Sequence, residues 1–406
     1  MHKSRLSNKI IYRILLWALL IAGILILIRL APTLSKPEYL LSDDFVRYWA
    51  SGKLNQEGLN PFDPEIIQKL QLELGGTIVW PDTTSITLTP PWVMPLLMPL
   101  GMFSYPTGRL VWLLVSVVIL LFSSQLLWRI YTGNRKLRWL AILVTVIFAP
   151  TISVLEKGQI TNLVLLGLAG FLFYTSVKRN DWLAGICLSL VSCKPQLILL
   201  FWLALFVWVI QQRRWLILIS TAICVLSLTL ITIAFNSHII QQYFGMIQSY
   251  GIADWANPTF GAYLCFFWFG ANQFWLQFLP AVFSAVWFIY YWHRHHRSWD
   301  WLREMPIILL VSLITSPYSW TYDQVILIPV IIQAAVWLAA DWKHRRVIIF
   351  GIIYLALNLL NLLLHMRLDD FWFIWFAPSL FIWYLLLCRQ YPSGIGYSRL
   401  SNQTVG

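Results

Sequence analysis

The chain is divided into long apolar runs separated by short polar segments. A membrane hydrocarbon core of about 30 Å is crossed by roughly 20 residues of helix, so apolar runs near this length predict transmembrane helices. We expect spans at 11–30, 109–129, 138–155, 159–177, 182–193, 197–211, 215–235, 273–292, 305–316, 324–340, 347–365 and 371–388. The pattern predicts an all-α polytopic membrane protein, in which residues 1–406 form one integral membrane domain with about 12 transmembrane helices (roughly 10–13).

The loop of residues 31–107, between the first two spans, begins its first amphipathic helix with two adjacent acids. Ser42 can serve as the N-cap, so Asp43 and Asp44 lie in the first turn. Asp44, Arg47 and Tyr48 then share one helical face, because they are spaced at i, i+3 and i+4. An acidic helix start also complements the helix macrodipole, so the local pattern leaves a structural and a functional interpretation open.

A second amphipathic helix follows in the same loop. Asp63 is placed to be its N-cap, Pro64 suits the first helical position, and Gly75 and Gly76 end it. Such a helix is expected to lie on the membrane surface. The next stretch, residues 89–101, holds four prolines among apolar residues, so we expect an interfacial or re-entrant segment packed against protein.

Composition and charge support this membrane assignment. Hydrophobic residues make up 59% of the chain, charged residues 11%, and the mean hydropathy is +0.68, which excludes a soluble globular domain. Five cysteines without a CxxC pair indicate neither a disulfide framework nor a zinc site. No helical pattern of metal-ligating histidines or nucleotide-binding loop is present, so the sequence indicates no metal site and no cofactor.

The net charge of +12 is distributed by side of the membrane. The N-terminus and every second loop after it hold 20 of the 29 lysines and arginines, but only four of the 17 acidic residues. This asymmetry obeys the positive-inside rule, so we expect both termini in the cytoplasm and residues 31–107 outside it. The basic charge is explained by this topology and does not indicate a nucleic-acid partner.

Two predicted spans, 182–193 and 305–316, are too short to cross a membrane. Twelve residues of helix rise only about 18 Å, so Lys194 at the first turning point lies at the floor of an outward-facing recess, or is buried. Its ammonium suits an anionic lipid phosphate, although a lysine at this depth can also snorkel to the interface. After the second short span, Tyr322 and Asp323 could hydrogen-bond a sugar hydroxyl or cap the following helix.

Several short motifs along residues 40–330 resemble those of glycosyltransferase family 87. The first loop carries an acid, then Tyr-x-Ala and Gly-x-Asn-Pro-Phe/Tyr-Asp, here Asp44, Tyr48, Ala50, Gly58, Asn60, Pro61, Phe62 and Asp63. Later landmarks follow in order: Pro90, Pro91 and Trp92 with Pro99 and Leu100; Gly158, Gln159 and Asn162; Lys194 and Pro195; Ser316, Pro317, Trp320, Tyr322 and Asp323. Each motif alone is weak, but the ordered set is fairly specific.

The resemblance implies a GT-C-like bundle that takes a sugar from a polyprenyl-phosphate sugar at the outer face of the cytoplasmic membrane. The acceptor would be a lipid or glycan, and mannose is the family's default sugar. The family's general base is an aspartate of the first outer loop, which maps to Asp44. Some members carry histidines where this chain has Tyr322 and Asp323, so the role of those histidines does not transfer to this chain.

The chemistry of glycosyl transfer assigns roles to the candidates. A carboxylate must take the proton of the acceptor hydroxyl, and Asp44 is the candidate base with Asp43 as its alternative. Repulsion between the two acids is expected to raise one pKa. Positive charge must stabilise the departing phosphate, for which we expect Lys194 with support from Arg47 or Arg109. The candidate substrate-binding residues are Tyr48, Gln159, Asn162, Trp320, Tyr322 and Asp323. A single displacement would invert the sugar's configuration, with no metal required.

Two other functions share parts of this pattern. A lipid-linked-sugar flippase or other transporter also needs intramembrane charge and broken helices, but no internal repeat is obvious and the first loop is long and structured. A glycan polymerase or ligase would be expected to carry its large loop later and to rely on outer arginines, which here are only Arg29, Arg47, Arg109 and Arg367. The sequence therefore favours a membrane glycosyltransferase.

Overall fold

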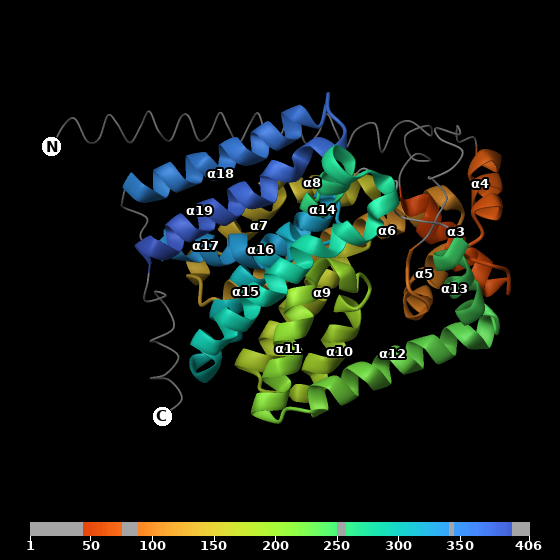
Figure 1. Ribbon diagram of the computed structural model, residues 1–406, viewed down its shortest axis with the longest axis horizontal. Coiled ribbons are helices and arrows are strands. Elements are labelled where there is room, and N and C mark those ends of the chain that lie inside the picture. Colours follow the sequence, from red (N-terminus) through yellow and green to blue (C-terminus); the bar gives the residue numbers. More distant parts are fainter. Residues whose placement is uncertain (1–43, 75–87, 250–256, 341–344, 392–406) are drawn as a thin grey trace.

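A computed structural model describes residues 44–74, 88–249, 257–340 and 345–391, and every regular element within them is a helix. The predicted span 11–30, together with Ser42, Asp43, Gly75 and Gly76, lies outside the described residues. Figure 1 shows α3, α4, α5 and α13 gathered at one end of a helical bundle.

The helices of the first half are α3 (Phe45–Gln56), α4 (Pro64–Glu73), η1 (Pro91–Val93), α5 (Met94–Gly101), α6 (Tyr105–Ile130), η2 (Arg135–Leu137), α7 (Trp139–Ile147), α8 (Ala149–Lys157), α9 (Thr161–Leu172), η3 (Phe173–Val177), α10 (Asp181–Val191), η4 (Pro195–Ile198) and α11 (Leu199–Gln212). Those of the second half are α12 (Leu216–Phe235), α13 (Ile239–Ser249), α14 (Phe260–Leu264), η5 (Cys265–Phe269), η6 (Ala271–Phe278), α15 (Leu279–His295), η7 (His296–Ser298), α16 (Trp301–Ile314), η8 (Thr321–Leu327), α17 (Ile328–Ala340), α18 (Arg345–Leu364), η9 (Asp370–Trp375) and α19 (Phe376–Gln390). The segments η3 and η5 are π-helical, and the other η segments are 3₁₀ helices.

Within the described residues, six helices are long and apolar enough to cross a membrane, or seven if the bent pair η2–α7 and α8 forms one span. These helices establish a membrane protein, but the expected count of about 12 is not confirmed. Several predicted spans are short or broken. The predicted span 138–155 is bent by 61° at Phe148. The predicted span 182–193 forms α10, which has only 11 residues and is as short as expected.

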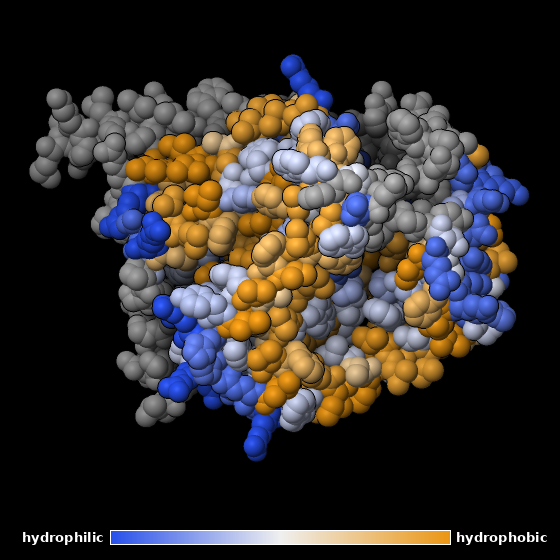
Figure 2. All heavy atoms as spheres, in the orientation of Figure 1, coloured by the Kyte–Doolittle hydropathy of each residue, from blue (hydrophilic) through white to orange (hydrophobic). Residues whose placement is uncertain are grey.

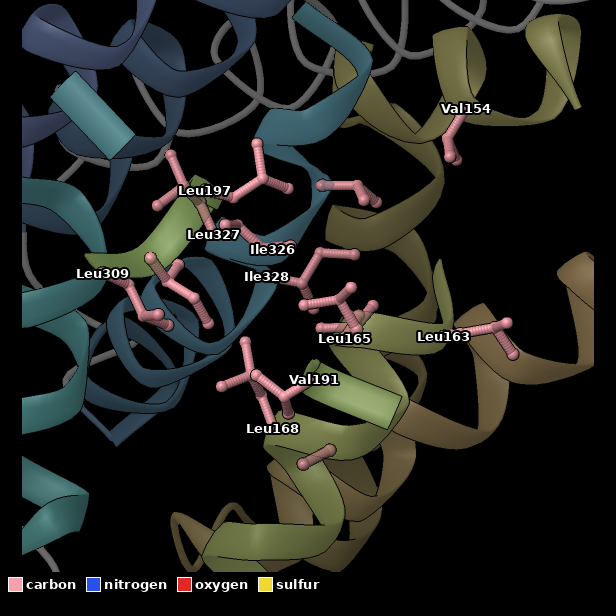
Figure 3. Packing of buried hydrophobic residues seen from close by; sticks show 14 of the residues in the cluster. Val154, Leu163, Leu165, Leu168, Val191, Leu197, Leu309, Ile326, Leu327 and Ile328 are labelled. Carbon is pink, nitrogen blue, oxygen red and sulfur yellow. The ribbon is translucent and has the colours of Figure 1, made fainter. Parts of the chain in front are cut away.

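The bundle has a buried centre and an exposed periphery. In the central span, Thr321–Ala340, 83% of an 18-residue apolar stretch is buried inside the protein. The corresponding fraction for α12 is only 17%. Figure 3 shows Leu197 of η4 and Ile326 and Leu327 of η8 close to one another within this apolar packing. Figure 2 shows hydrophobic residues over the middle of one face and hydrophilic ones at its ends, as a membrane-embedded bundle requires.

The two helices of the first loop form close to where the pattern predicted them, but α3 begins at Phe45, so Asp44 is its N-cap residue and does not lie in its first turn. Asp63 is the N-cap of α4, since its carboxylate accepts hydrogen bonds from the N–H groups of Glu65 and Ile66. The proline-rich stretch forms the short helix α5, which packs closely on α3. A Cβ at Gly52 would lie 2.5 Å from the carbonyl oxygen of Leu97, so this contact requires glycine.

Two helix breaks lie next to each other in the interior of the bundle, and residues of both line the candidate site. One separates α10 from η4 at Lys194, and the other separates α16 from η8 at residues 315–320. The hydroxyl of Ser316 donates to the carbonyl of Gln196, which joins the two breaks. Broken helices free backbone groups for other partners, and inside a membrane they are tolerated where protein surrounds them or a cavity is lined.

Candidate active site

A pocket with about 500 Å³ of empty space, part of it open to solvent, lies between α3 and the two helix breaks. It is lined by Asp44, Arg47, Tyr48, Leu88, Thr89, Gln159, Cys193, Lys194, Gln196, Tyr318 and Tyr322. Six of the predicted site residues, from four separate segments of the chain, therefore share one pocket. Lys194 faces it as a predominantly buried side chain, 13% exposed.

Asp44 occupies the N-cap position of α3, but its side chain does not cap the helix. Its carboxylate instead accepts a 2.5 Å hydrogen bond from Nε2 of Gln159 and lies 3.5 Å from Nη2 of Arg47. The side chain is 19% exposed and lines the pocket. This geometry favours a functional carboxylate over the purely structural helix start that the sequence also allowed.

The charge of Asp44 is set by competing effects. Burial raises the pKa of its carboxyl, but the positive charges of Arg47, Lys157 and Lys194 and the hydrogen bond from Gln159 outweigh burial, so the net pKa is lowered from 3.8. Repulsion between Asp43 and Asp44 was expected to raise one of their two pKa values; the pKa of Asp44 is not the raised one, because cations dominate its surroundings. Asp43, the alternative base, lies outside the described residues.

Gln159 connects the two charged halves of the pocket. Its Oε1 accepts hydrogen bonds from the Tyr48 hydroxyl at 2.6 Å and from Nζ of Lys194 at 2.8 Å, while its Nε2 donates to the carboxylate of Asp44. Burial, followed by the negative charges of Asp44 and Asp323, raises the pKa of Tyr48 well above its usual value. The phenol therefore stays protonated and acts as a hydrogen-bond donor.

The turn that carries Gln159 is held by α6. Gly158 ends α8 with φ of +65°, and a Cβ there would lie 2.6 Å from Cβ of Phe45. Trp112 donates its indole N–H to the carbonyl of Gly158, and Nη2 of Arg109 donates to the carbonyls of Leu155 and Glu156, at 2.8–2.9 Å. Arg109, expected beside the phosphate, is not brought into the pocket and instead binds the carboxyl end of α8.

Lys194 is paired with a buried carboxylate. Its Nζ lies 2.8 Å from Oδ1 of Asp323, whose side chain is 1% exposed, and 5.0 Å from the ring centre of Tyr322. Asp323 also accepts hydrogen bonds from the Thr161 hydroxyl at 2.6 Å and from the N–H of Trp320 at 3.0 Å. The ammonium therefore does not snorkel to the interface: it is fixed at the pocket wall.

Three aromatic residues follow one another across the second helix break. Trp320 donates its indole N–H to the hydroxyl of Tyr318 at 2.7 Å and stacks on Tyr322, with ring planes 19° apart. Tyr318 and Tyr322 line the pocket, while Trp320 supports them. Asn162 is fully buried outside the pocket lining, and its Oδ1 accepts the N–H of Leu163.

The sequence profile of glycosyltransferase family 87 matches residues 88–317, more than half of the chain. The chain belongs to glycosyltransferase family 87. It is therefore a membrane glycosyltransferase, with a sugar donor and an acceptor as substrates. No curated protein and no solved structure matched the chain.

The match to glycosyltransferase family 87 covers the segments that carry Gln159 and Lys194, but Asp44 and Asp323 lie outside it. The structure also places residues that sequence reasoning missed. Thr161 lies in the predicted motif between Gln159 and Asn162, and Tyr318 lies within the predicted break, so their positions inside stretches already singled out were the signal that could have identified them.

Proposed function

We propose that this member of glycosyltransferase family 87 transfers a hexose, mannose by family default, from a polyprenyl-phosphate sugar to a lipid or glycan acceptor. The reaction would take place at the extracytoplasmic face of the cytoplasmic membrane. The single observation that carries the proposal is the pocket in which an ionised, partly exposed carboxylate, Asp44, faces a fixed ammonium, Lys194, with Gln159 between them.

Asp44 has the properties of the general base. Its pKa is lowered, so the carboxylate is ionised and able to accept the proton of an acceptor hydroxyl as that oxygen attacks the anomeric carbon. Gln159 and Arg47 orient it through its two oxygens. Asp43 remains the alternative base.

Lys194 and Arg47 are placed to receive the phosphate. As the bond between the anomeric carbon and the phosphate oxygen breaks, its electron pair leaves with the oxygen, and the phosphate gains a negative charge. Positive groups fixed in advance at this position lower the barrier, because they need no reorganisation during the reaction. One direct displacement inverts the anomeric configuration, and we expect the reaction to need no metal ion or other cofactor.

The remaining pocket residues are proposed to bind the sugar. Tyr48 is a protonated hydroxyl donor, and Tyr318 and Tyr322 give the pocket an aromatic wall of the kind that packs on sugar faces, with Trp320 stacked on Tyr322 in support. Asp323 is proposed to act on the substrate through Lys194, since its carboxylate is buried behind the ammonium. Arg109 and Asn162 act outside the pocket, by holding the turn and the helix start around Gln159.

A transfer assay in nanodiscs tests the reaction class. Wild-type protein would receive radiolabelled polyprenyl-phosphate mannose and, separately, the corresponding glucose and arabinose donors, with a lipid extract as acceptor. We expect label from one donor to move into a glycolipid, with inverted configuration at the anomeric carbon. Tight binding of a lipid-linked sugar without transfer from any donor would contradict the proposal and favour a flippase.

A further inference from the structure

Residues 257–278, here called the aromatic hairpin, contain no charged residue, and nine of their 22 residues are Phe, Tyr or Trp. The hairpin is too irregular to be a span. It consists of α14 with five residues, the π-helical η5 with five and the 3₁₀-helical η6 with eight, and Gly270 at φ +77° separates the last two. A transmembrane helix needs about 20 residues.

The large side chains of the hairpin lie on the molecular surface. Phe266 is 67% exposed, Trp268 is 72% exposed and Trp275 is 64% exposed. Trp372, from the start of η9, is also exposed. The aromatic surface is defined here as Phe266, Phe267, Trp268, Trp275 and Trp372.

Specific contacts hold the hairpin to the segment that carries Trp372. The rings of Tyr263 and Phe371 stack with centres 4.3 Å apart, and the Tyr263 hydroxyl donates to the carbonyl oxygen of Phe371 at 2.9 Å. The ring of Phe266 lies 5.2 Å from the same Phe371 ring. The contacts of Tyr263 and Phe266 with Phe371 therefore hold the exposed aromatic residues of the two segments together.

The hairpin adjoins the pocket's own wall. Pro258 and Phe260 line a small cavity together with Ser319 and Gln324, which belong to the segment that also carries Tyr318 and Tyr322. The start of the aromatic hairpin and the candidate active site therefore adjoin the same segment, residues 318–324.

Three environments can be compared for this surface. Bulk water is disfavoured, because a monomer rarely exposes so many large apolar side chains together. The hydrocarbon core is disfavoured, because irregular backbone facing lipid leaves polar groups without partners. The headgroup interface accepts both irregular backbone and aromatic rings, and Trp and Tyr are enriched there.

The surface is also continuous with exposed apolar side chains of α15. Phe278 ends the hairpin at 44% exposure, and Val282 and Phe283 continue its exposed side along α15. Hydrophobic residues predominate along α15 in Figure 2, where Figure 1 places this helix. We propose that the aromatic surface docks into the headgroup layer of the lipid leaflet on the pocket's side of the membrane. This assignment does not depend on the proposed reaction.

Depth-dependent fluorescence quenching tests the docking. The full chain would be placed in nanodiscs of phosphatidylethanolamine and phosphatidylglycerol whose acyl chains carry bromine near the headgroup or near the chain end. The signal is the fluorescence of wild type minus that of the Trp268→Phe/Trp275→Phe variant. We expect several-fold stronger quenching of this difference by shallow bromine than by deep bromine.

A buried tryptophan supplies the control. Trp301 is 2% exposed, so the fluorescence lost in Trp301→Phe should be insensitive to both brominated lipids. The substitution breaks no hydrogen bond among the described residues, because the indole N–H of Trp301 has no partner there. A separate Trp372→Phe difference repeats the test from the second segment. Quenching by aqueous acrylamide alone, strongest quenching by deep bromine, or no quenching together with cross-linking of two chains through Trp268→Cys would each overturn the proposal.

Discussion

The Nζ atom of Lys194 lies 2.8 Å from Oδ1 of Asp323, a carboxylate that is buried between α9 and the start of η8. The same Nζ donates to Oε1 of Gln159, whose amide nitrogen donates to Asp44. A continuous chain of polar contacts therefore runs from the partly exposed carboxylate to the buried one. Because each of these side chains is hydrogen-bonded to the next, the effect of replacing one of them on stability or activity depends on whether its partner is also replaced.

Replacing Lys194 by Met should destabilise the protein more than a typical surface change. It leaves Asp323 buried without its cation, which typically costs about 3–5 kcal/mol. The double variant Lys194→Met/Asp323→Asn removes both charges and should recover most of the thermal stability in nanodiscs, while remaining inactive because the phosphate lacks its cation. Wild-type stability in the single variant would contradict the buried pairing.

Removing the charge of Arg47 should shift the acid limb of the activity profile. Burial raises the pKa of Asp44, and Arg47 makes the largest contribution that lowers it. Activity that requires ionised Asp44 is lost as pH falls through its pKa, which is lowered, so the wild-type limb lies at acid pH. In Arg47→Gln the pKa rises and the limb moves to higher pH. A profile of kcat/KM against pH measures the shift, and an unchanged limb would exclude Asp44 as the titrating base.

Alanine at Gly158 should weaken both stability and transfer. The left-handed φ of +65° strains any L-residue, which costs about 1–3 kcal/mol, and the new Cβ would collide with Phe45. The displaced turn carries Gln159 away from Asp44. Gly245→Ala in α13 is the matched control, because open space surrounds it and removing glycine from a helix stabilises by about 0.4–1 kcal/mol. Equal thermal stability in the two variants would contradict this account.

The first residue of η9, Asp370, should matter through its carboxylate. Asp370 accepts hydrogen bonds at 2.9 Å from Nε2 of His365 and from the N–H of Thr321, and so fixes the first residue of η8. Asp370→Asn should lower kcat several-fold, since hydrogen bonds to charged groups contribute about 1.5–3 kcal/mol. Exposed Asp369 offers the control, and Asp369→Asn should match wild type. Equal rates in the two variants would show that η8 needs no such anchor.

The sequence predicted the helical class, the membrane environment and most helix boundaries of the first loop, because spacing and capping are local properties. Asp63 and Pro64, for example, begin α4 as expected. The number of transmembrane spans was harder to predict from the sequence. The bend at Phe148 is followed by Pro150, a local signal for a helix break, since proline cannot donate to the preceding turn. Asn358 of α18 accepts the N–H of Ala149 at this bend, and that contact with a distant residue could not be read from the sequence.

The site was predictable as a set of residues but not as an arrangement. Depth and helix breaks identified Lys194 and Asp323, yet their pairing joins residues 129 positions apart in the chain. Arg109 was expected in the pocket because arginine suits a phosphate, but long side chains also satisfy helix ends, and α8 supplies carbonyls within its reach. Asp370 contacts η8 through Thr321, 49 positions away in the chain, so no local pattern indicated this contact.

The central claim is that Asp44 takes the proton of the acceptor. The most direct measurement compares label transfer by wild type, Asp44→Asn, Asp43→Asn and the N-cap variant Asp63→Asn, each in nanodiscs with the active donor. We predict that Asp44→Asn alone loses about 10²–10⁴-fold of the transfer rate while still binding the donor. Transfer near the wild-type rate in Asp44→Asn, with the loss found in Asp43→Asn instead, would contradict the claim.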